Sequence, residues 1–364
     1  MFIGFVKPLR NVFWHSNSKS NNKLMKILIL GVNGFIGHHL SRRILDTTTW
    51  EVYGMDINTD RIADEIRHER FHFFEGDITI NREWIEYHIK KCDVIIPLVA
   101  IATPATYIKD PLSVFELDFE ANLPIVRAAV RYKKRLIFPS TSEVYGMSSD
   151  DEFDSENSLL VYGPISKSRW IYACSKQLMD RVIFAYGQKD GLKFTLFRPF
   201  NWIGFGLDSI NDLKEGSSRV VSQFLGQILR GQDIQLVDGG AQRRCFTDIS
   251  DGIDALMTII ENPQDVADGK IYNIGHPEND LSIAELASHM ITVALEYPEF
   301  VEAASKVKLE AIAGENYYGV GYQDTSRRVP CIKNTQHDLA WTPQMDMNMA
   351  LRQLFEAYRQ QPLL

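Results

Sequence analysis

Cysteine is scarce in this sequence, and long apolar runs are lacking altogether. The four cysteines, Cys92, Cys174, Cys245 and Cys331, are far apart and form no Cys-x-x-Cys pair. They therefore suggest neither a disulfide framework nor a zinc site, as is typical of a reducing compartment. No run of about 18 apolar residues occurs, so no membrane span is expected. We expect a cytoplasmic protein with no metal and no membrane partner.

Basic residues are fewer than acidic residues in this sequence. The sequence has 39 Lys and Arg against 47 Asp and Glu, a formal net charge of −8. Proteins that bind nucleic acids need a basic surface, so no nucleic-acid partner is expected. Any anionic ligand must therefore be met by a few local arginines rather than by an overall positive field.

The first 24 residues differ from the rest of the chain. Residues 1–24 contain no acidic residue, and polar side chains dominate from Ser16 to Asn22. Their apolar residues are too scattered for the core of a signal peptide. We therefore expect residues 1–24 to be a flexible N-terminal extension.

From Met25 onward the pattern is that of a buried strand, a glycine-rich turn and a helix. The apolar run Ile27–Leu30 leads into Gly31, Gly34 and Gly37 at the spacing Gly-x-x-Gly-x-x-Gly. Gly31 would permit the tight turn, Gly34 would let the backbone approach a pyrophosphate, and Gly37 would allow the helix to pack closely on the strand. The helix N-terminus offers free N–H groups to the phosphates. This context predicts a dinucleotide-binding site.

A second strand, expected over 51–57, carries Asp56 near its end. The acid lies about 20 residues after the last glycine, where a carboxylate can accept hydrogen bonds from the adenosine ribose. Because a carboxylate there repels a 2′-phosphate, NAD is favoured over NADP. A helix N-cap is the alternative explanation for this aspartate.

Further strands alternate with helices as far as residue 200. We expect strands at 71–74, 93–99, 135–139 and 193–198, and a long helical stretch over 111–132. This alternation predicts an α/β fold with a Rossmann-like doubly wound parallel sheet. Since ligands bind at the carboxyl ends of such strands, a set of side chains beyond the strand ends should converge on one cleft: Asp56, Asp77, Ala102, Ser142, Glu143 and Asn201.

Beyond residue 200 the pattern changes to a smaller mixed α/β lobe. Helices are expected at 217–229, 252–260, 281–295 and 349–359, with strands at 234–237, 271–274 and 307–312. We therefore divide the chain into three parts. They are the extension 1–24, an NAD-binding Rossmann domain 25–200 with a returning segment at about 245–275, and a mainly substrate-binding lobe 201–364.

Tyr172 and Lys176 lie one turn apart on the helix that precedes the strand at 193–198. Neither is a ready base at neutral pH, since their usual pKa values are about 10 and about 10.4. An ammonium beside the phenol favours the phenolate and should lower the tyrosine pKa. The pair could then take a proton from a hydroxyl while a hydride leaves the same carbon. The spacing alone is weak evidence, because it also occurs on solvated helix faces.

Four motifs in this order resemble the extended short-chain dehydrogenases/reductases that act on nucleotide sugars. The motifs are Gly31 to Gly37, Thr141-Ser142-Glu143-Val144-Tyr145-Gly146, Tyr172-x-x-x-Lys176 and Arg198-Pro199-Phe200-Asn201. More closely, the sequence from Met25 to about Gln360 resembles the UDP-glucuronate oxidative decarboxylases, which occur as one domain of bifunctional polymyxin-resistance enzymes. No part of it resembles their formyltransferase domain, so formyl transfer is not expected.

The resemblance implies two sets of binding residues. The set implied for NAD is Gly31, Gly34, Phe35, Ile36, Gly37, Asp56, Asp77, Ile78, Ala100, Tyr172 and Lys176. The set implied for UDP-glucuronate is Ala102, Tyr107, Thr141, Ser142, Arg169, Asn201, Gln235 to Arg244, Tyr322 and Arg328. In the implied chemistry Tyr172 with Lys176 is the base, and Ser142 or Thr141 hydrogen-bonds the developing oxyanion. Glu143 and Arg328 serve the decarboxylation.

Adjacent arginines leave one role open. Spacing from Tyr322 selects Arg328, but Arg327 could share or take the role. Arginine also suits phosphate, so several arginines are candidates for a pyrophosphate clamp: Arg328, Arg169, Arg219 and Arg244.

The expected reaction is NAD-dependent oxidation and decarboxylation of UDP-glucuronate to a UDP-4-keto-pentose, CO₂ and NADH. A UDP-xylose synthase, which reuses its NADH, is an alternative because the same tyrosine, lysine and glutamate serve both. A nucleotide-sugar 4-epimerase or 4,6-dehydratase is a weaker alternative, and a non-catalytic NAD-binding regulator weaker still. The resemblance also implies a homodimer or higher homo-oligomer formed through helices that include that of Tyr172.

Overall fold

The computed structural model describes residues 24–211, 218–314, 323, 325 and 327–359. Of the predicted N-terminal extension only Leu24 falls in these ranges, and Tyr322 lies outside the described residues.

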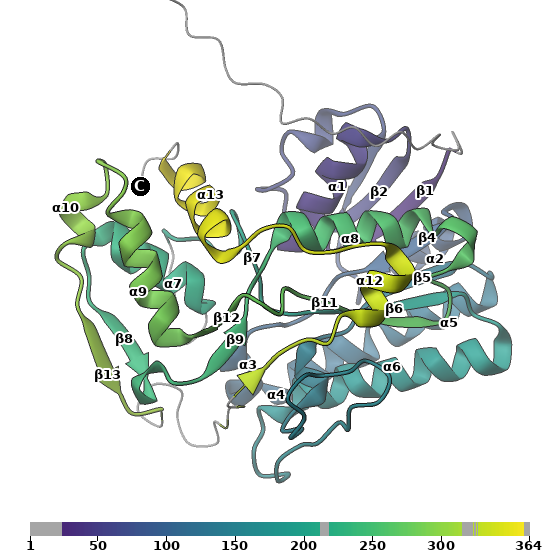
Figure 1. Ribbon diagram of the computed structural model, residues 1–364. Coiled ribbons are helices and arrows are strands. Elements are labelled where there is room, and N and C mark those ends of the chain that lie inside the picture. The colour runs from purple at the N-terminus through teal and green to yellow at the C-terminus, as the bar shows by residue number, and fades with distance from the viewer. Residues whose placement is uncertain (1–23, 212–217, 315–322, 324, 326, 360–364) are drawn as a thin grey trace, which may run out of the picture.

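A seven-stranded parallel sheet forms the centre of the molecule, in the order β11-β6-β5-β4-β1-β2-β3 (Figure 1). Its strands are β1 (Lys26–Leu30), β2 (Glu51–Asp56), β3 (Phe71–Glu75), β4 (Val94–Pro97), β5 (Arg135–Pro139), β6 (Phe194–Pro199) and β11 (Lys270–Ile274). The order runs outward in both directions from β1 and β4, as in a doubly wound sheet. The predicted fold class is therefore confirmed.

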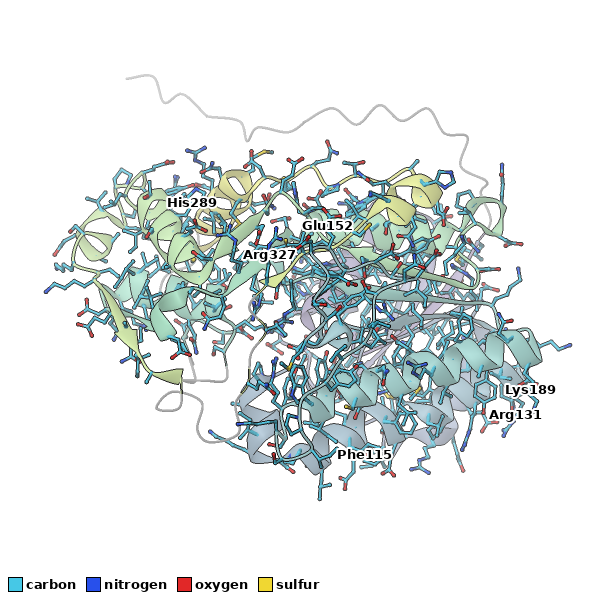
Figure 2. All side chains as sticks on the ribbon, turned by 60° about the horizontal axis from the view of Figure 1, so that its bottom comes forward. Phe115, Arg131, Glu152, Lys189, His289 and Arg327 are labelled. Atoms are coloured by element: carbon cyan, nitrogen blue, oxygen red, sulfur yellow. The ribbon has the colours of Figure 1, made fainter. Side chains whose placement is uncertain are left out.

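Helices cover both faces of the sheet. Alternate residues of β1 enter different cores: Ile27 and Ile29 join one cluster, whereas Leu28 and Leu30 join the other, because successive strand side chains point to opposite faces. The helices of the first face are α1 (Phe35–Thr47) and α8 (Ile249–Glu261). The helices of the second are α2 (Arg82–Lys91), α5 (Leu123–Arg131) and α6 (Trp170–Asp190). Arg131 and Lys189 mark the neighbouring ends of α5 and α6 (Figure 2).

The helical stretch expected over 111–132 is interrupted. The chain forms α3 (Pro104–Lys109), α4 (Pro111–Phe115), a π-helical turn η2 (Glu116–Glu120) and then α5. A π-helical turn holds one residue more than an α-helical turn, so it changes which side chains face the interior. The side chain of Asp118, which lies in this turn, is completely buried.

The predicted helix at 281–295 begins later than expected. Residues Asp280–Ser282 form β12, and α9 spans Ile283–Ala294. Ser282 is the N-cap: its hydroxyl accepts a hydrogen bond from the Glu285 N–H, and the Glu285 carboxylate accepts one from the Ser282 N–H. This capping box sets the start of the helix.

The remaining elements form the smaller lobe and its links to the sheet. Its strands are β7 (Trp202–Ile203), β8 (Ile234–Val237), β9 (Arg243–Cys245), β10 (Thr247–Asp248), β13 (Leu309–Ile312) and β14 (Arg327–Arg328). Its helices are α7 (Val220–Arg230), α9, α10 (Val301–Ala304) and α13 (Met347–Arg359), whereas α12 (Lys333–Leu339) packs on β11 and α8. Short 3₁₀ turns are η1 (Glu65–Arg67), η3 (Ser142–Tyr145), η4 (Asp238–Gly240) and η5 (Pro263–Asp265).

The chain returns to the Rossmann sheet after β10. Helix α8 packs on α1, and β11 pairs with β6 in parallel, with Lys270 opposite Thr195. The division of the chain into separate domains stays a prediction.

None of the helices in the described ranges is long and apolar enough to cross a membrane. No cluster of three or more His, Cys, Asp or Glu side chains in that part of the chain could hold a metal ion.

Candidate active site

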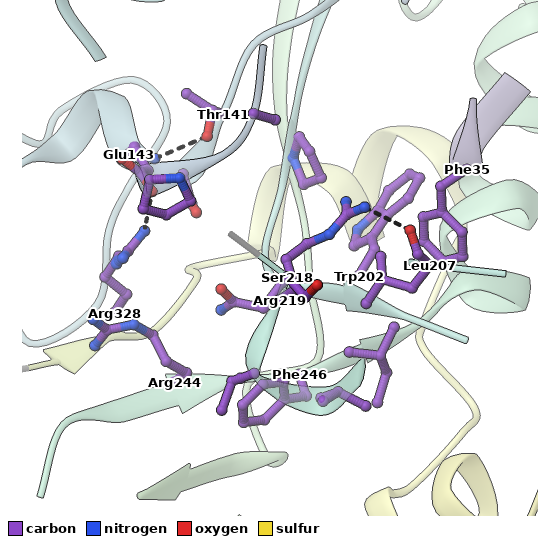
Figure 3. A pocket seen from close by; sticks show the side chains of 18 of the residues that line it. Phe35, Thr141, Glu143, Trp202, Leu207, Ser218, Arg219, Arg244, Phe246 and Arg328 are labelled. Carbon is purple, nitrogen blue, oxygen red and sulfur yellow. Dashed lines mark hydrogen bonds and ion pairs between the residues drawn. The ribbon is translucent and has the colours of Figure 1, made fainter. Parts of the chain in front are cut away.

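A cavity of about 370 Å³ lies where the carboxyl ends of the central strands meet the smaller lobe (Figure 3). It brings together most of the residues singled out in the sequence: Phe35, Ile36, Ala100, Ala102, Tyr107, Thr141, Ser142, Glu143, Arg169, Tyr172, Lys176, Asn201, Gln235, Arg244 and Arg328. The remaining cofactor candidates, Gly31, Gly34, Gly37, Asp56, Asp77 and Ile78, do not line it. Gly31 and Gly34 lie on the turn between β1 and α1, and Gly37 lies in the first turn of α1. Asp56 ends β2, and Asp77 and Ile78 follow β3.

The glycine turn between β1 and α1 leaves room only for backbone. Gly31 has a positive φ of 85°, which L side chains rarely adopt. A Cβ at Gly37 would lie 2.4 Å from the carbonyl oxygen of Gly31 and 2.7 Å from that of Val32. The turn and the first N–H groups of α1 thus form a narrow cradle, which fits the pyrophosphate of a dinucleotide.

Asp56 is tied to this turn. Its Oδ2 accepts a hydrogen bond from the Asn33 N–H at 2.9 Å, and its Oδ1 accepts one from the Ile57 N–H at 2.8 Å. Burial raises the pKa of Asp56. The next helical turn along the described chain begins only at Glu65, so Asp56 does not cap a helix.

Tyr172 and Lys176 are both buried on α6. The ring of Tyr172 stacks on that of Tyr107, with centroids 4.7 Å apart and planes inclined by 8°. The Lys176 ammonium donates a hydrogen bond to the Pro139 carbonyl oxygen, at the end of β5, at 3.1 Å. The packing therefore fixes both side chains at the carboxyl edge of the sheet.

The pKa of Tyr172 is raised in this site and not lowered, although the sequence leads us to expect that the Lys176 ammonium favours the phenolate. Burial, and then the negative charges of Asp118 and Glu143, raise the pKa of Tyr172 above its usual value. A hydrogen bond with Thr141 and the charge of Arg219 lower it, but less. Burial dominates because an enclosed phenolate loses its hydration.

Glu143 lies between two arginines. It belongs to η3, where the Thr141 hydroxyl accepts a hydrogen bond from the Glu143 N–H at 3.2 Å. One carboxylate oxygen is 3.1 Å from an Arg169 nitrogen, and the other is 3.6 Å from an Arg328 nitrogen. Both arginine side chains are almost entirely buried, at 4% and 7% exposure. The arrangement concentrates one negative and two positive charges beside Tyr172.

The smaller lobe closes the cavity with further basic groups. Arg244 on β9 pairs with Arg328 on β14, so the two arginines lie side by side. Arg219, just before α7, forms a two-point ion pair with Asp208 and reaches toward Leu207 in Figure 3. Asn201 donates a hydrogen bond to the Cys245 carbonyl oxygen. Of the predicted substrate residues, only Tyr322 cannot be placed, because it lies outside the described residues.

Sequence reasoning missed two buried acids near Tyr172 and Lys176, namely Asp118 and Asp180. Asp180 accepts hydrogen bonds from Ser140 at 2.7 Å and from Arg198 at 3.1 Å. Asp118, between apolar Leu117 and Phe119, faces Lys176 from the π-helical turn. A charged residue inside an apolar stretch is the signal that could have found it.

A family model described as NAD dependent epimerase/dehydratase family matches residues 27–275, which include the glycine turn and the Tyr172–Lys176 helix. The chain belongs to this family. It is thus an NAD-dependent enzyme of the oxidoreductase type. Its cofactor is NAD, which the glycine cradle and Asp56 fit.

Solved structures agree with this assignment. The crystal structure of PbgP3 protein from Burkholderia pseudomallei is 65% identical, covers 93% of this chain and 97% of its own, and superposes with a TM-score of 0.84.

Two more distant structures share the fold alone. UDP-glucuronic acid 4-epimerase from Bacillus cereus, in complex with UDP-glucuronic acid and NAD, is 21% identical over 92% of this chain and 99% of its own (TM-score 0.76). dTDP-glucose 4,6-dehydratase from Bacillus anthracis, in complex with NAD, is 20% identical over 93% of this chain and 97% of its own (TM-score 0.74).

Proposed function

We propose that the protein catalyses NAD-dependent oxidative decarboxylation of UDP-glucuronate to a UDP-4-keto-pentose, CO₂ and NADH. The observation that carries the proposal is the group formed by Glu143, Arg169 and Arg328 in the wall of the cavity that holds Tyr172. Guanidinium groups suit carboxylates, and a site that only oxidised a neutral sugar would not need two buried arginines around an acid.

The chemistry requires oxidation before decarboxylation. A uronic acid does not lose CO₂ easily, but a ketone at C4 makes it a β-keto acid. The new carbonyl then accepts the electron pair released when the bond to CO₂ breaks, and the resulting enolate is protonated at C5. Bound NAD supplies the hydride acceptor and, in its oxidised form, a positive charge.

Tyr172 takes the proton of the 4-hydroxyl as general base. Its raised pKa in the protein alone means that the phenolate must be favoured by positive charge, which Lys176 and the oxidised cofactor provide. Ser142 and Thr141 donate hydrogen bonds to the oxyanion that develops at C4.

Arg328 holds the substrate carboxylate and stabilises the charge of the transition state. A guanidinium keeps its proton in proteins and is a poor literal acid, so the proton returned at C5 passes through water or Glu143. Glu143 keeps Arg328 and Arg169 oriented through its two carboxylate oxygens.

The smaller lobe is proposed to bind the nucleotide. Gln235 of β8 and Arg244 of β9 line the cavity from the smaller lobe, and the guanidinium of Arg244 suits a phosphate. Asn201, Ala102 and Tyr107 also line the cavity, and we propose that they contact the sugar.

The decisive experiment incubates the purified protein with UDP-glucuronate and excess NAD. We expect NADH to accumulate in proportion to CO₂ and a UDP-4-keto-pentose to be identified by NMR. UDP-xylose without net NADH would indicate that the cofactor is reused, and a product formed without CO₂ would refute decarboxylation.

Tyr172→Phe removes the base and keeps the ring that stacks on Tyr107. We expect NADH formation to fall at least about 10²-fold, while calorimetry shows NAD binding within a few-fold of the wild-type value. Turnover at the wild-type rate would overturn the mechanism.

We also propose a homodimer formed through the face of α4 and α6. Leu112 of α4 and Leu178 and Phe184 of α6 are exposed apolar side chains on these two packed helices. Sedimentation velocity tests the proposal, and a monomer at micromolar concentration would contradict it.

A further inference from the structure

Asp118 is a fully buried carboxylate that none of the roles above uses. It lies in the π-helical turn η2, which packs against α6. Its Oδ1 accepts a hydrogen bond from the Ile101 N–H at 2.7 Å. Its Oδ2 is buried and has no hydrogen-bond partner among the described residues. A buried carboxylate with only one oxygen hydrogen-bonded destabilises the folded state. An asparagine could accept the same hydrogen bond from Ile101 without a buried charge, so the charge itself calls for an explanation.

The charge of Asp118 is directed at the catalytic pair. After burial, it is the strongest influence on the pKa of both Tyr172 and Lys176, and it raises both. In return, Lys176 is the strongest charge acting on Asp118. The titratable groups that face Asp118 are these two on α6 and Tyr107 on α3.

Lys176 has a second acidic neighbour, Asp180, whose charge is already paired with an arginine. Asp180 also favours the charged form of Lys176. However, it forms an ion pair with Arg198 at 3.1 Å and accepts a hydrogen bond from Ser140. Within the described part of the chain Asp118 forms no ion pair. Its negative charge is therefore the less neutralised of the two.

We propose that Asp118 is a positioning residue, a buried counter-charge that keeps Lys176 protonated and sets the pH range in which Tyr172 and Lys176 work. It acts through the pair and does not contact the substrate. The inference rests on the proposed use of Tyr172 and Lys176 in hydride-transfer chemistry. It does not depend on which nucleotide sugar is oxidised.

The test uses Asp118→Asn, which keeps the acceptor for Ile101 and removes only the charge. Because the charge raises the pKa of both the phenol and the ammonium, its removal lowers both. The rising and falling limbs of the pH–rate profile should therefore both move to lower pH, by about one unit or more. A purely structural role would lower the rate without moving the profile.

Glu120→Gln is the matched control. Glu120 lies in the same π-helical turn and is exposed, so the same change in charge should leave the profile in place. Both variants and the wild type are assayed for NADH formation with UDP-glucuronate from about pH 5.5 to 9.5. An Asp118→Asn profile with unshifted limbs, or an equal shift in Glu120→Gln, would overturn the proposal.

A second readout needs no substrate. Burial raises the pKa of Asp118 to about 6, above the value of about 3.9 expected in the unfolded chain. In this window the folded state binds more protons than the unfolded state, so the contribution of Asp118 to stability falls as pH rises. Relative to the wild type, Asp118→Asn should gain in Tm by several degrees from about pH 4 to 6.5. A pH-independent difference would contradict the proposal.

The pH–rate profile and the Tm comparison together distinguish failure of the proposed substrate from failure of the proposed role of Asp118. If the wild type makes no NADH from UDP-glucuronate, the proposed substrate is wrong, and the Tm comparison still tests Asp118. If Asp118→Asn does not fold, Lys176→Met replaces it. The charge of Lys176 lowers the pKa of Asp118, so its loss should raise that pKa further. The pH at which Asp118 destabilises the folded protein should then be higher than in the wild type. The same midpoint pH in both proteins would refute the coupling between Lys176 and Asp118.

Discussion

Arg327 and Arg328 are adjacent in the sequence but have different surroundings. Successive residues of a strand point to opposite sides, and both belong to β14. Arg328 is buried against Glu143 in the cavity, whereas Arg327 is exposed and pairs with Asp280 at 3.2 Å (Figure 2). The two arginines therefore have different partners and exposure, and this difference supports the proposed role of Arg328 rather than Arg327.

Arg328→Met tests this choice, with Arg327→Met as the matched control. Methionine keeps much of the length of arginine but cannot hold a carboxylate. We expect CO₂ release to fall about 10²-fold or more in Arg328→Met and to stay within a few-fold of the wild-type rate in Arg327→Met. Labelled CO₂ and NADH absorbance are measured together. Equal losses in both variants would show that position 328 has no special role.

The first helix and its turn show how an element builds a site. The glycines bring the N-terminus of α1 against the end of β1, and a side chain at Gly37 would meet backbone oxygens that cannot move away easily. The first N–H groups of α1 have no acceptor within the helix, and the close packing at Gly37 places them beside the end of β1.

Gly37→Ala should disturb both stability and cofactor binding. We expect a loss of about 1–3 kcal/mol in the free energy of unfolding, because the added Cβ overlaps the oxygens of Gly31 and Val32. NAD should bind at least about tenfold more weakly, as calorimetry would show. Asp46→Ala, on the exposed side of α1, is the control. An unchanged affinity in Gly37→Ala would argue against a pyrophosphate at this turn.

At the scale of the whole molecule, the cavity is assembled from segments far apart in the chain. Strand β14 pairs with β9 and carries Arg328 to Glu143, in the turn η3 that follows β5.

Folding also buries polar groups whose titration changes the stability of the whole molecule. His38 on α1 is 6% exposed, and burial, followed by the charge of His39, lowers its pKa from 6.5 to about 3.

His38 should make the protein sensitive to acid. Between pH 6.5 and about 3 the unfolded chain binds the proton that the folded His38 excludes, so stability falls as pH falls. The full effect is on the order of 4 kcal/mol. Asp118 has the opposite effect, because its contribution to stability falls as the pH rises.

His38→Asn should lose less stability than the wild type when the pH is lowered from about 6.5 to 4. Urea unfolding at several pH values measures the difference. Parallel stability curves for the two proteins would show that His38 is not the group responsible.

The sequence by itself determined the parallel α/β sheet, the glycine turn and the Tyr172–Lys176 pair, because strand periodicity and short motifs are local properties. Only the tertiary structure decided the π-helical turn that buries Asp118 and the opposite surroundings of Arg327 and Arg328. It also decided the direction of the Tyr172 pKa. Burial and long-range charge depend on which distant segments meet, and no local pattern specifies that.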